Sequence, residues 1–209
     1  LFIVCFVMLF VGGAKLKHLG SIVGSAIVGF SFLVLLNLAF PGFLPRVDTW
    51  QKRLLSFESG SRQENYQAEM AKRAVANGFL FGKGPGKGHV KNDLYSAQSD
   101  FIYASSIEEF GSLIGGLGLV VLYLILFFRS IRIMNKTESR FGAYVVFGLS
   151  FMMIFQSFIN MGVGVNLFPV TGQPLPLISM GGTSILFTCI SLGIILNISR
   201  TVYKDSTDE

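Results

Sequence analysis

Residues 101–128 read FIYASSIEEFGSLIGGLGLVVLYLILFF, a long apolar run interrupted only by the adjacent acids Glu108 and Glu109. This run exceeds the roughly 20 residues that an α-helix needs to cross the hydrocarbon core of a bilayer. Three further runs have a comparable character, at 19–40, 141–160 and 178–199. The pattern predicts an all-α polytopic membrane protein built as a helix bundle.

The composition of the 209 residues agrees with this fold class. Apolar residues make up 51% of the chain and charged residues only 14%, whereas soluble domains carry about 25% charge. This excludes a cytosolic globule, and the hydrophobicity excludes disorder. Cys5 and Cys189 lie inside apolar runs and read as small packing residues. Because the basic residues are spread over loops, the net charge of +5 favours anionic lipid headgroups or a phosphorylated substrate over nucleic acid.

The order of apolar and polar segments predicts the membrane topology. The run at 1–14 is shorter than a full span, so we expect the chain to begin inside a helix. Short basic segments at 15–18 and 129–140 and in the tail fall on one side, which the positive-inside rule makes cytoplasmic. The predicted organisation is two transmembrane helices at 1–40 with a cytoplasmic turn at 15–18, a large extracytoplasmic loop at 41–100, three transmembrane helices at 101–200 with a re-entrant Pro-rich loop at 161–177, and a cytoplasmic tail at 201–209.

The large loop contains two predicted short helices, at 53–57 and 66–77, followed by the Gly-rich stretch GFLFGKGPGKG at 78–88. The stretch does not match the Walker phosphate-binding pattern, because Gly86-Lys87 is followed by glycine instead of Ser or Thr. Its backbone amides, with Lys83 and Lys87, remain candidates to hold a diphosphate. The alternative is a flexible turn with solvated lysines.

Three acids near the start of the 101–128 run have two interpretations each. Asp100 is either the N-cap of the following helix or a general base at the membrane boundary. Glu108 and Glu109 lie about 12 Å further along a continuous helix, at 1.5 Å per residue. Acids inside a membrane span are functional or are paired within the bundle, so a structural pair with a basic group from another helix stays open.

Seven motifs follow one another along nearly the whole chain. In order they are KRLLSF (52–57), NYQ (65–67), LFGKG (80–84), SDFIYA (99–104), EEFG (108–111), FQSFIN (155–160) and PVTGQPLPLISMGGTS (169–184). The series resembles the C-terminal half of the SEDS family (shape, elongation, division and sporulation), and the last motif is highly specific. The ending at 178–184 and Gln173 are more similar to the division (FtsW-like) type than to the elongation (RodA-like) type.

The resemblance implies a peptidoglycan glycosyltransferase of the bacterial inner membrane, and we expect it at the division septum. Such an enzyme polymerises lipid II into glycan strands, releases undecaprenyl diphosphate and works with a class B penicillin-binding protein, a transpeptidase. Two alternatives from other classes remain: a lipid II transporter, and a non-catalytic scaffold for the transpeptidase.

The resemblance also implies site residues. The essential acid of the family matches Asp100, which becomes the expected catalytic residue. We expect substrate binding by Lys83, Lys87, Lys91, Ser99, Glu108, Glu109, Ser179 and Ser184. No tightly bound cofactor is expected; a divalent cation, Mg²⁺ or Mn²⁺, is a candidate to help neutralise the diphosphate. The chain departs from many relatives just before the acid, where Tyr95, Ser96 and Gln98 replace Pro, Glu and His, so no role of that Glu or His is carried over.

Overall fold

The computed structural model describes residues 2–39, 62–88 and 99–205. These residues contain helices and no strands. The chain divides into two compact units, Leu1–Asn65 and Tyr66–Glu209. By length and composition, four helical segments could cross a membrane, which fits the predicted multi-pass helical fold. The predicted helix at 53–57 lies outside the described residues.

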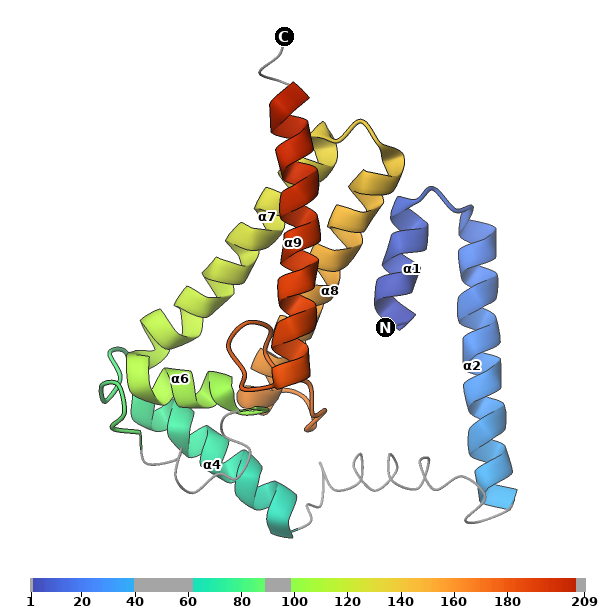
Figure 1. Cartoon of the computed structure of the whole chain (residues 1–209). Coiled ribbons are helices and arrows are strands. Elements are labelled where there is room, and N and C mark those ends of the chain that lie inside the picture. Colours follow the sequence, from blue (N-terminus) through green and yellow to red (C-terminus); the bar gives the residue numbers. More distant parts are fainter. Residues whose placement is uncertain (1, 40–61, 89–98, 206–209) are drawn as a thin grey trace. The chain divides into compact units, whose positions relative to one another are not determined.

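The first unit holds an antiparallel helix pair (Figure 1). Helix α1 is Phe2–Val11 and helix α2 is Leu16–Ala39. Gly13 has φ +79° in the turn between them, a backbone conformation that glycine adopts without steric cost. The basic residues Lys15, Lys17 and His18 are exposed there.

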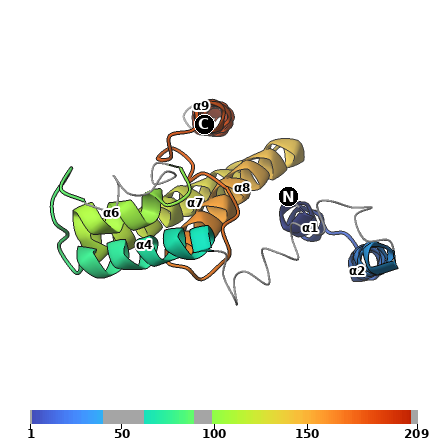
Figure 2. The ribbon, with the colours of Figure 1, turned by 90° about the horizontal axis from the view of Figure 1, so that it is seen from below.

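The second unit is a three-helix bundle with two shorter helices at one end (Figures 1 and 2). Helix α7, Leu119–Lys136, and helix α8, Arg140–Gly164, form an antiparallel hairpin, and α9, Gly182–Asp205, packs on both. Phe127 of α7 packs on Phe147 and Phe151 of α8, with ring centroids 6.3 Å apart in both pairs. Helix α4, Arg62–Gly78, and helix α6, Ile102–Gly111, lie side by side at the far end from the α7–α8 turn.

The 101–128 run is not one continuous helix, contrary to our expectation. Helix α6 ends at Gly111, which has φ +82°, and a π-helix, η1 at Ser112–Gly118, connects it to α7. The chain turns back so sharply that Gly115 lies against the backbone of Ser106 and Ile107. A glycine is required at both places because a Cβ would overlap backbone atoms.

The Gly-rich stretch stabilises this reversal. The Ser112 N–H donates to the Phe79 carbonyl at 2.8 Å, and the Leu113 N–H donates to the Leu80 carbonyl at 3.4 Å. These donors have lost their intrahelical acceptors at the break, and buried backbone groups must be paired. The Gly-rich stretch is therefore a folded part of the structure, contrary to the interpretation as a flexible turn.

Other boundaries also differ from the prediction. Helix α4 confirms the helix expected at 66–77 but begins at Arg62. Helix α8 continues through Gly164, so the Pro-rich loop runs from Val165 instead of 161 and ends where α9 begins. In the second unit, the α7–α8 turn and the C-terminal part of α9 lie at one end of the bundle, while α4 and α6 lie at the other (Figure 1).

Candidate active site

The backbone of Asp100 is fixed by hydrogen bonds from two distant segments. Asn160 of α8 donates from Nδ2 to the Asp100 carbonyl at 3.1 Å. Ser179, in the Pro-rich loop, donates from Oγ to the Ser99 carbonyl at 2.7 Å. Both donors are buried, so these bonds are shielded from competition by water. The segment that carries Asp100 is thus tied to α8 and to the loop at the same time.

Phe101 anchors the same segment from the other side. Its ring is 1% exposed and packs with Ala71 and Ala74 of α4, Ala104 of α6 and Val163 of α8. Burying a phenylalanine side chain contributes about 2 to 3 kcal/mol. The structural role of Phe101, which follows Asp100 in the motif, is therefore to fix the position of the Asp100 backbone by packing in this core.

The Asp100 side chain is not a helix cap. Helix α6 begins at Ile102, its N-cap position is Phe101, and no side chain caps it. Asp100 is partly exposed, and its carboxylate makes no hydrogen bond or ion pair with the described residues. A carboxylate on a rigid backbone whose oxygens are not engaged can accept a proton from a bound group. Asp100 therefore does not cap α6, and its role as a general base stays a prediction.

Three side chains of α7 and α8 hold the Pro-rich loop beside Asp100. Gln156 donates to the Pro174 carbonyl at 2.9 Å, Asn160 donates to the Gln173 carbonyl at 2.7 Å, and Tyr123 donates to the Pro176 carbonyl. Within the loop, the Leu175 N–H donates to Ser179 Oγ at 2.7 Å. Because the loop cannot pair its backbone as a helix does, these side chains satisfy its carbonyls.

Asn160, Gln156 and Tyr123 were not among the predicted site residues. The sequence did contain a signal for two of them. Gln156 and Asn160 are separated by four residues in an apolar run, which places them on one face of a helix, and amides in a membrane span need partners. Nothing in the sequence identified the loop carbonyls as those partners.

Glu108 is a buried structural acid in this fold. Its side chain is 0% exposed and forms an ion pair with Lys83, with Nζ and Oε1 3.3 Å apart. The backbone repeats the contact, because Lys83 N–H donates to the Glu108 carbonyl at 3.0 Å and Gly84 N–H to the Glu109 carbonyl at 2.9 Å. The structural interpretation expected a basic partner from another helix. The partner, Lys83, instead comes from the Gly-rich stretch. Substrate contacts of Lys83, Glu108 and Glu109 stay predictions.

The remaining predicted binding residues are distributed over several places. Lys87 is exposed and has no ion pair with a residue that the structure describes. Ser179 uses its hydroxyl in the two bonds to Leu175 and Ser99. Ser184 lies in the first turn of α9 and is partly buried. Lys91 lies outside the described residues.

The described residues do not provide a ligand set for a divalent cation. No group of three or more His, Cys, Asp or Glu side chains that could hold a metal ion occurs among them. Glu108, the most buried of the acids whose burial the structure describes, pairs with Lys83, and an ammonium group beside a carboxylate opposes cation binding. The residues described here thus do not fit a protein-held Mg²⁺ or Mn²⁺ ion.

The Asn160→Leu substitution should lower the free energy of unfolding by about 1 to 3 kcal/mol, because it removes the buried donor of two part-buried hydrogen bonds to the Asp100 and Gln173 carbonyls. Denaturant unfolding of the purified protein in detergent measures the change. Asn197→Leu is the matched control, since Asn197 is exposed on α9. Equal stability of the two variants would show that the Asn160 bonds do not hold this segment.

The Lys83→Met substitution should cost about 1 to 2 kcal/mol of stability, because it takes the Lys83 ammonium group away from the buried Glu108 carboxylate. The effect is smaller than for a fully buried pair, since the Lys83 side chain is 33% exposed and solvent screens it. Lys87→Met, on the same loop, should stay within about 0.5 kcal/mol of the wild type. The same unfolding assay compares them, and a Lys83 variant as stable as the Lys87 variant would contradict the pairing.

Comparison with known proteins shows similarity along the whole described chain. A family model described as "Cell cycle protein" and named for FtsW, RodA and SpoVE matches residues 1–204. "Stage V sporulation protein E" of Bacillus subtilis (strain 168) is 36% identical over 201 residues, covering 94% of this chain and 52% of that protein. "Probable peptidoglycan glycosyltransferase FtsW" of Haemophilus ducreyi is 34% identical over 205 residues, covering 95% of this chain and 49% of that protein.

A solved structure is also similar. It is described as "Structural coordination of polymerization and crosslinking by a peptidoglycan synthase complex" and matches with a TM-score of 0.62 and 26% identity over 95% of this chain and 53% of that chain. The chain thus spans about half the length of the curated relatives it matches.

Proposed function

Because this chain belongs to the FtsW/RodA/SpoVE family of cell cycle proteins, the SEDS family, we propose that it forms part of a peptidoglycan glycosyltransferase that polymerises lipid II into glycan strands. The observation that carries the proposal is the Asp100 carboxylate, partly exposed and without a partner among the described residues, on a backbone held by Asn160 and Ser179. Relatives named as peptidoglycan glycosyltransferases support the reaction class.

The proposed chemistry assigns one proton transfer to Asp100. A sugar hydroxyl of the acceptor attacks the anomeric carbon of the donor, and the bond from that carbon to the diphosphate oxygen breaks. The hydroxyl proton passes to the Asp100 carboxylate as the new glycosidic bond forms. Undecaprenyl diphosphate leaves with the bonding electron pair. A fixed backbone matters here because the base must stay within hydrogen-bond reach of the hydroxyl.

We propose that cationic groups of the large loop neutralise the negative charge that develops on the leaving diphosphate. Lys87 is exposed and has no ion pair with a described residue, so its charge is available to the diphosphate. Lys91 has the same proposed role, whereas Lys83 divides its charge with Glu108. Cations directed at a leaving diphosphate stabilise the transition state more than the bound substrate. Ser99 and Ser184 stay in the proposal as hydroxyl groups that contact the sugars.

The proposed partner is a class B penicillin-binding protein, and the proposed location is the bacterial inner membrane at the division septum. The similar structure is a peptidoglycan synthase complex described as coordinating polymerisation and crosslinking. Relatives named FtsW favour the division type over the elongation type. The proposed partner and the proposed location both depend on the polymerase function, and both are refuted if that function is refuted.

Fluorescent lipid II added to the purified intact protein, with every other glycan polymerase excluded, tests the proposal. The expected product is a ladder of glycan strands. Translocation of lipid II across a vesicle membrane without a ladder would instead support a transporter. A protein that makes no ladder alone but is needed for crosslinking by its transpeptidase would be a scaffold. Either result, with an active polymerase as positive control, contradicts the proposal.

We further propose that no metal is retained by the protein and that Mg²⁺ or Mn²⁺, where the reaction needs one, arrives with the substrate diphosphate. After washing with EDTA and gel filtration, the protein should contain less than about one metal ion per ten chains, and added Mg²⁺ or Mn²⁺ should restore activity at once. Elemental analysis and the ladder assay measure the two outcomes. A stoichiometric metal that survives the wash would contradict this.

A further inference from the structure

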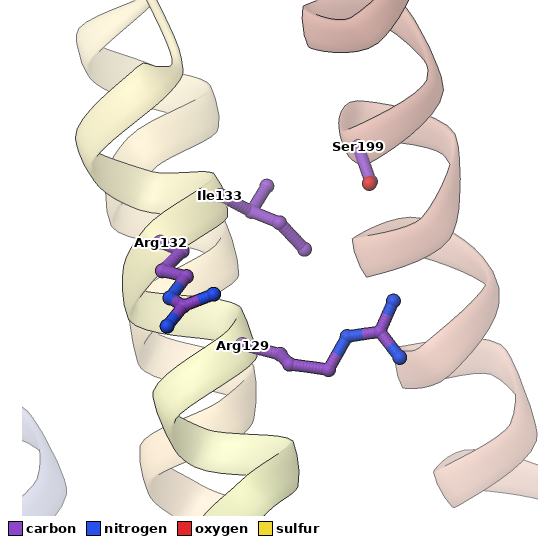
Figure 3. Close-up of a pocket in the computed structure, with 4 residues that line it drawn as sticks. All are labelled: Arg129, Arg132, Ile133 and Ser199. Atoms are coloured by element: carbon purple, nitrogen blue, oxygen red, sulfur yellow. The ribbon is translucent and has the colours of Figure 1, made fainter.

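A cavity with two arginines lies at the end of the bundle opposite Asp100. It has a volume of about 330 Å³ and is lined by Arg129, Arg132 and Ile133 of α7 and by Ser199 of α9. Figure 3 shows the Arg129 side chain extending from α7 toward α9, with the Ser199 hydroxyl directed into the same gap. The proposed polymerase reaction uses none of these residues.

The arginines of this cavity are not neutralised by acids in the part of the chain that the structure describes. No ion pair involves Arg129 or Arg132 there, although Glu138 lies in the nearby α7–α8 turn and Asp205 at the end of α9. Lys136, Arg140 and Arg200 add positive charge to the same end of the bundle. In Figure 3 the Arg129 guanidinium lies near α9 and the Arg132 guanidinium lies beside α7. Both groups and the Ser199 hydroxyl line the cavity, and each can donate to phosphate oxygens.

The surface beside the cavity is apolar. Leu122 and Ile125 precede Arg129 by seven and four residues on α7, which places them on its face of the helix, and they are 50% and 56% exposed. On α9, Leu196 precedes Ser199 by three residues and is 66% exposed. A cationic cavity that ends an apolar stripe matches an amphiphile with a phosphate head and an acyl chain.

The position along the helices supports the same ligand. Helices α7 and α9 belong to segments long and apolar enough to cross a membrane, and the cavity lies toward their ends, where basic residues gather. By the positive-inside rule this end faces the cytoplasm, and the cytoplasmic leaflet is rich in anionic lipid. A volume of about 330 Å³ is near the lower end of ligand cavities, about 300 Å³, and suits a headgroup with its chains outside.

We propose that the cavity formed by Arg129, Arg132, Ile133 and Ser199 binds the phosphodiester headgroup of an anionic phospholipid of the cytoplasmic leaflet. The guanidinium groups and the Ser199 hydroxyl donate to the phosphate oxygens, and the acyl chains lie along Leu122, Ile125 and Leu196. The site is separate from Asp100, so its failure and the failure of the polymerase proposal are distinguishable.

The test is titration of the intact, delipidated protein in a neutral detergent, with bound lipid counted by native mass spectrometry. The probes are dioleoyl phosphatidylglycerol and dioleoyl phosphatidylcholine. We expect the wild type to retain the anionic lipid preferentially. The double variant Arg129→Gln/Arg132→Gln should weaken that binding about tenfold or more, since each basic residue near the membrane surface contributes roughly 1 kcal/mol. Asp100→Asn should leave it unchanged.

The matched control is Arg140→Gln/Arg200→Gln, which removes the same charge from exposed arginines that do not line the cavity. An equal loss in both double variants would assign the effect to surface charge and overturn the site. Arg129→Lys/Arg132→Lys should bind more weakly than the wild type but more tightly than the Gln double variant, because the charge remains while the guanidinium donors are lost. Equal retention of the two lipids by the wild type, or full displacement by an equal concentration of inorganic phosphate, would also contradict a lipid headgroup site.

Discussion

The Asp100→Asn variant of the intact protein is expected to fold normally and to lose glycan polymerisation by about a hundredfold or more, the contribution of a positioned general base. The amide keeps the size of the carboxylate but cannot accept the hydroxyl proton. The hydrogen bonds that hold this segment use the Ser99 and Asp100 carbonyls and survive the change. The initial rate of ladder formation from fluorescent lipid II measures the loss.

The control for this variant is Glu69→Gln, which makes the same carboxylate-to-amide change at an exposed acid of α4 that pairs with Arg73. It should polymerise at the wild-type rate. Both variants should unfold at the wild-type denaturant midpoint, because neither side chain supports the core. If Asp100→Asn polymerises as fast as Glu69→Gln, Asp100 is not the base and the carboxylate has another role.

The Gly111→Ala variant is expected to lose about 3 kcal/mol or more of stability. Gly111 has φ +82° and ψ 167°, a region that is essentially restricted to glycine and costs other residues about 1 to 3 kcal/mol. Its Cβ would also overlap the Leu80 carbonyl and the Phe81 backbone, so the Gly-rich stretch would have to move. Thermal unfolding in detergent should show a melting temperature lower by about 6 °C or more.

The matched control is Gly193→Ala on α9, where a Cβ would meet nothing within 4 Å. Alanine is the better helix former, so this variant should be as stable as the wild type or slightly more stable. If Gly111→Ala loses both stability and polymerisation while Gly193→Ala loses neither, the helix break supports the candidate site. A Gly111→Ala protein that melts with the wild type would mean that α6 continues into α7 without the reversal.

The membrane helices could be predicted from the sequence because the thickness of the bilayer sets the length of the apolar runs that cross it. The reversal at Gly111 could not, since hydropathy does not distinguish a straight helix from two helical segments that fold back. One signal was present: Gly111, Gly115, Gly116 and Gly118 crowd a short part of the run. These glycines permit the chain to turn back, and carbonyls of the Gly-rich stretch accept hydrogen bonds from the N–H groups freed at the break.

The sequence predicts which acid acts in the candidate site, and that role stays a prediction. It did not predict how the segment around this acid is held. The family motif identified Asp100, but the Ser-Asp-Phe segment is held by Asn160 and Ser179, which lie 60 and 80 residues further along the chain from their acceptors. The expected depth of Glu108 in the membrane assumed a continuous helix. Because α6 ends at Gly111, the number of residues between Asp100 and Glu108 does not give the depth of Glu108 in the membrane. The pairing of Glu108 with Lys83 could not be predicted from the spacing either.

The most direct test of the central claim separates substrate binding from chemistry at Asp100. Lipid II binding to the intact wild-type and Asp100→Asn proteins is measured at equilibrium, and formation of the first glycosidic bond is then followed in a single turnover with saturating substrate. We predict the same dissociation constant for both proteins and a bond-forming rate at least about a hundredfold lower in the variant. A variant that binds lipid II weakly but forms the bond at the wild-type rate once saturated would contradict the account, because Asp100 would then hold the substrate and not accept its proton.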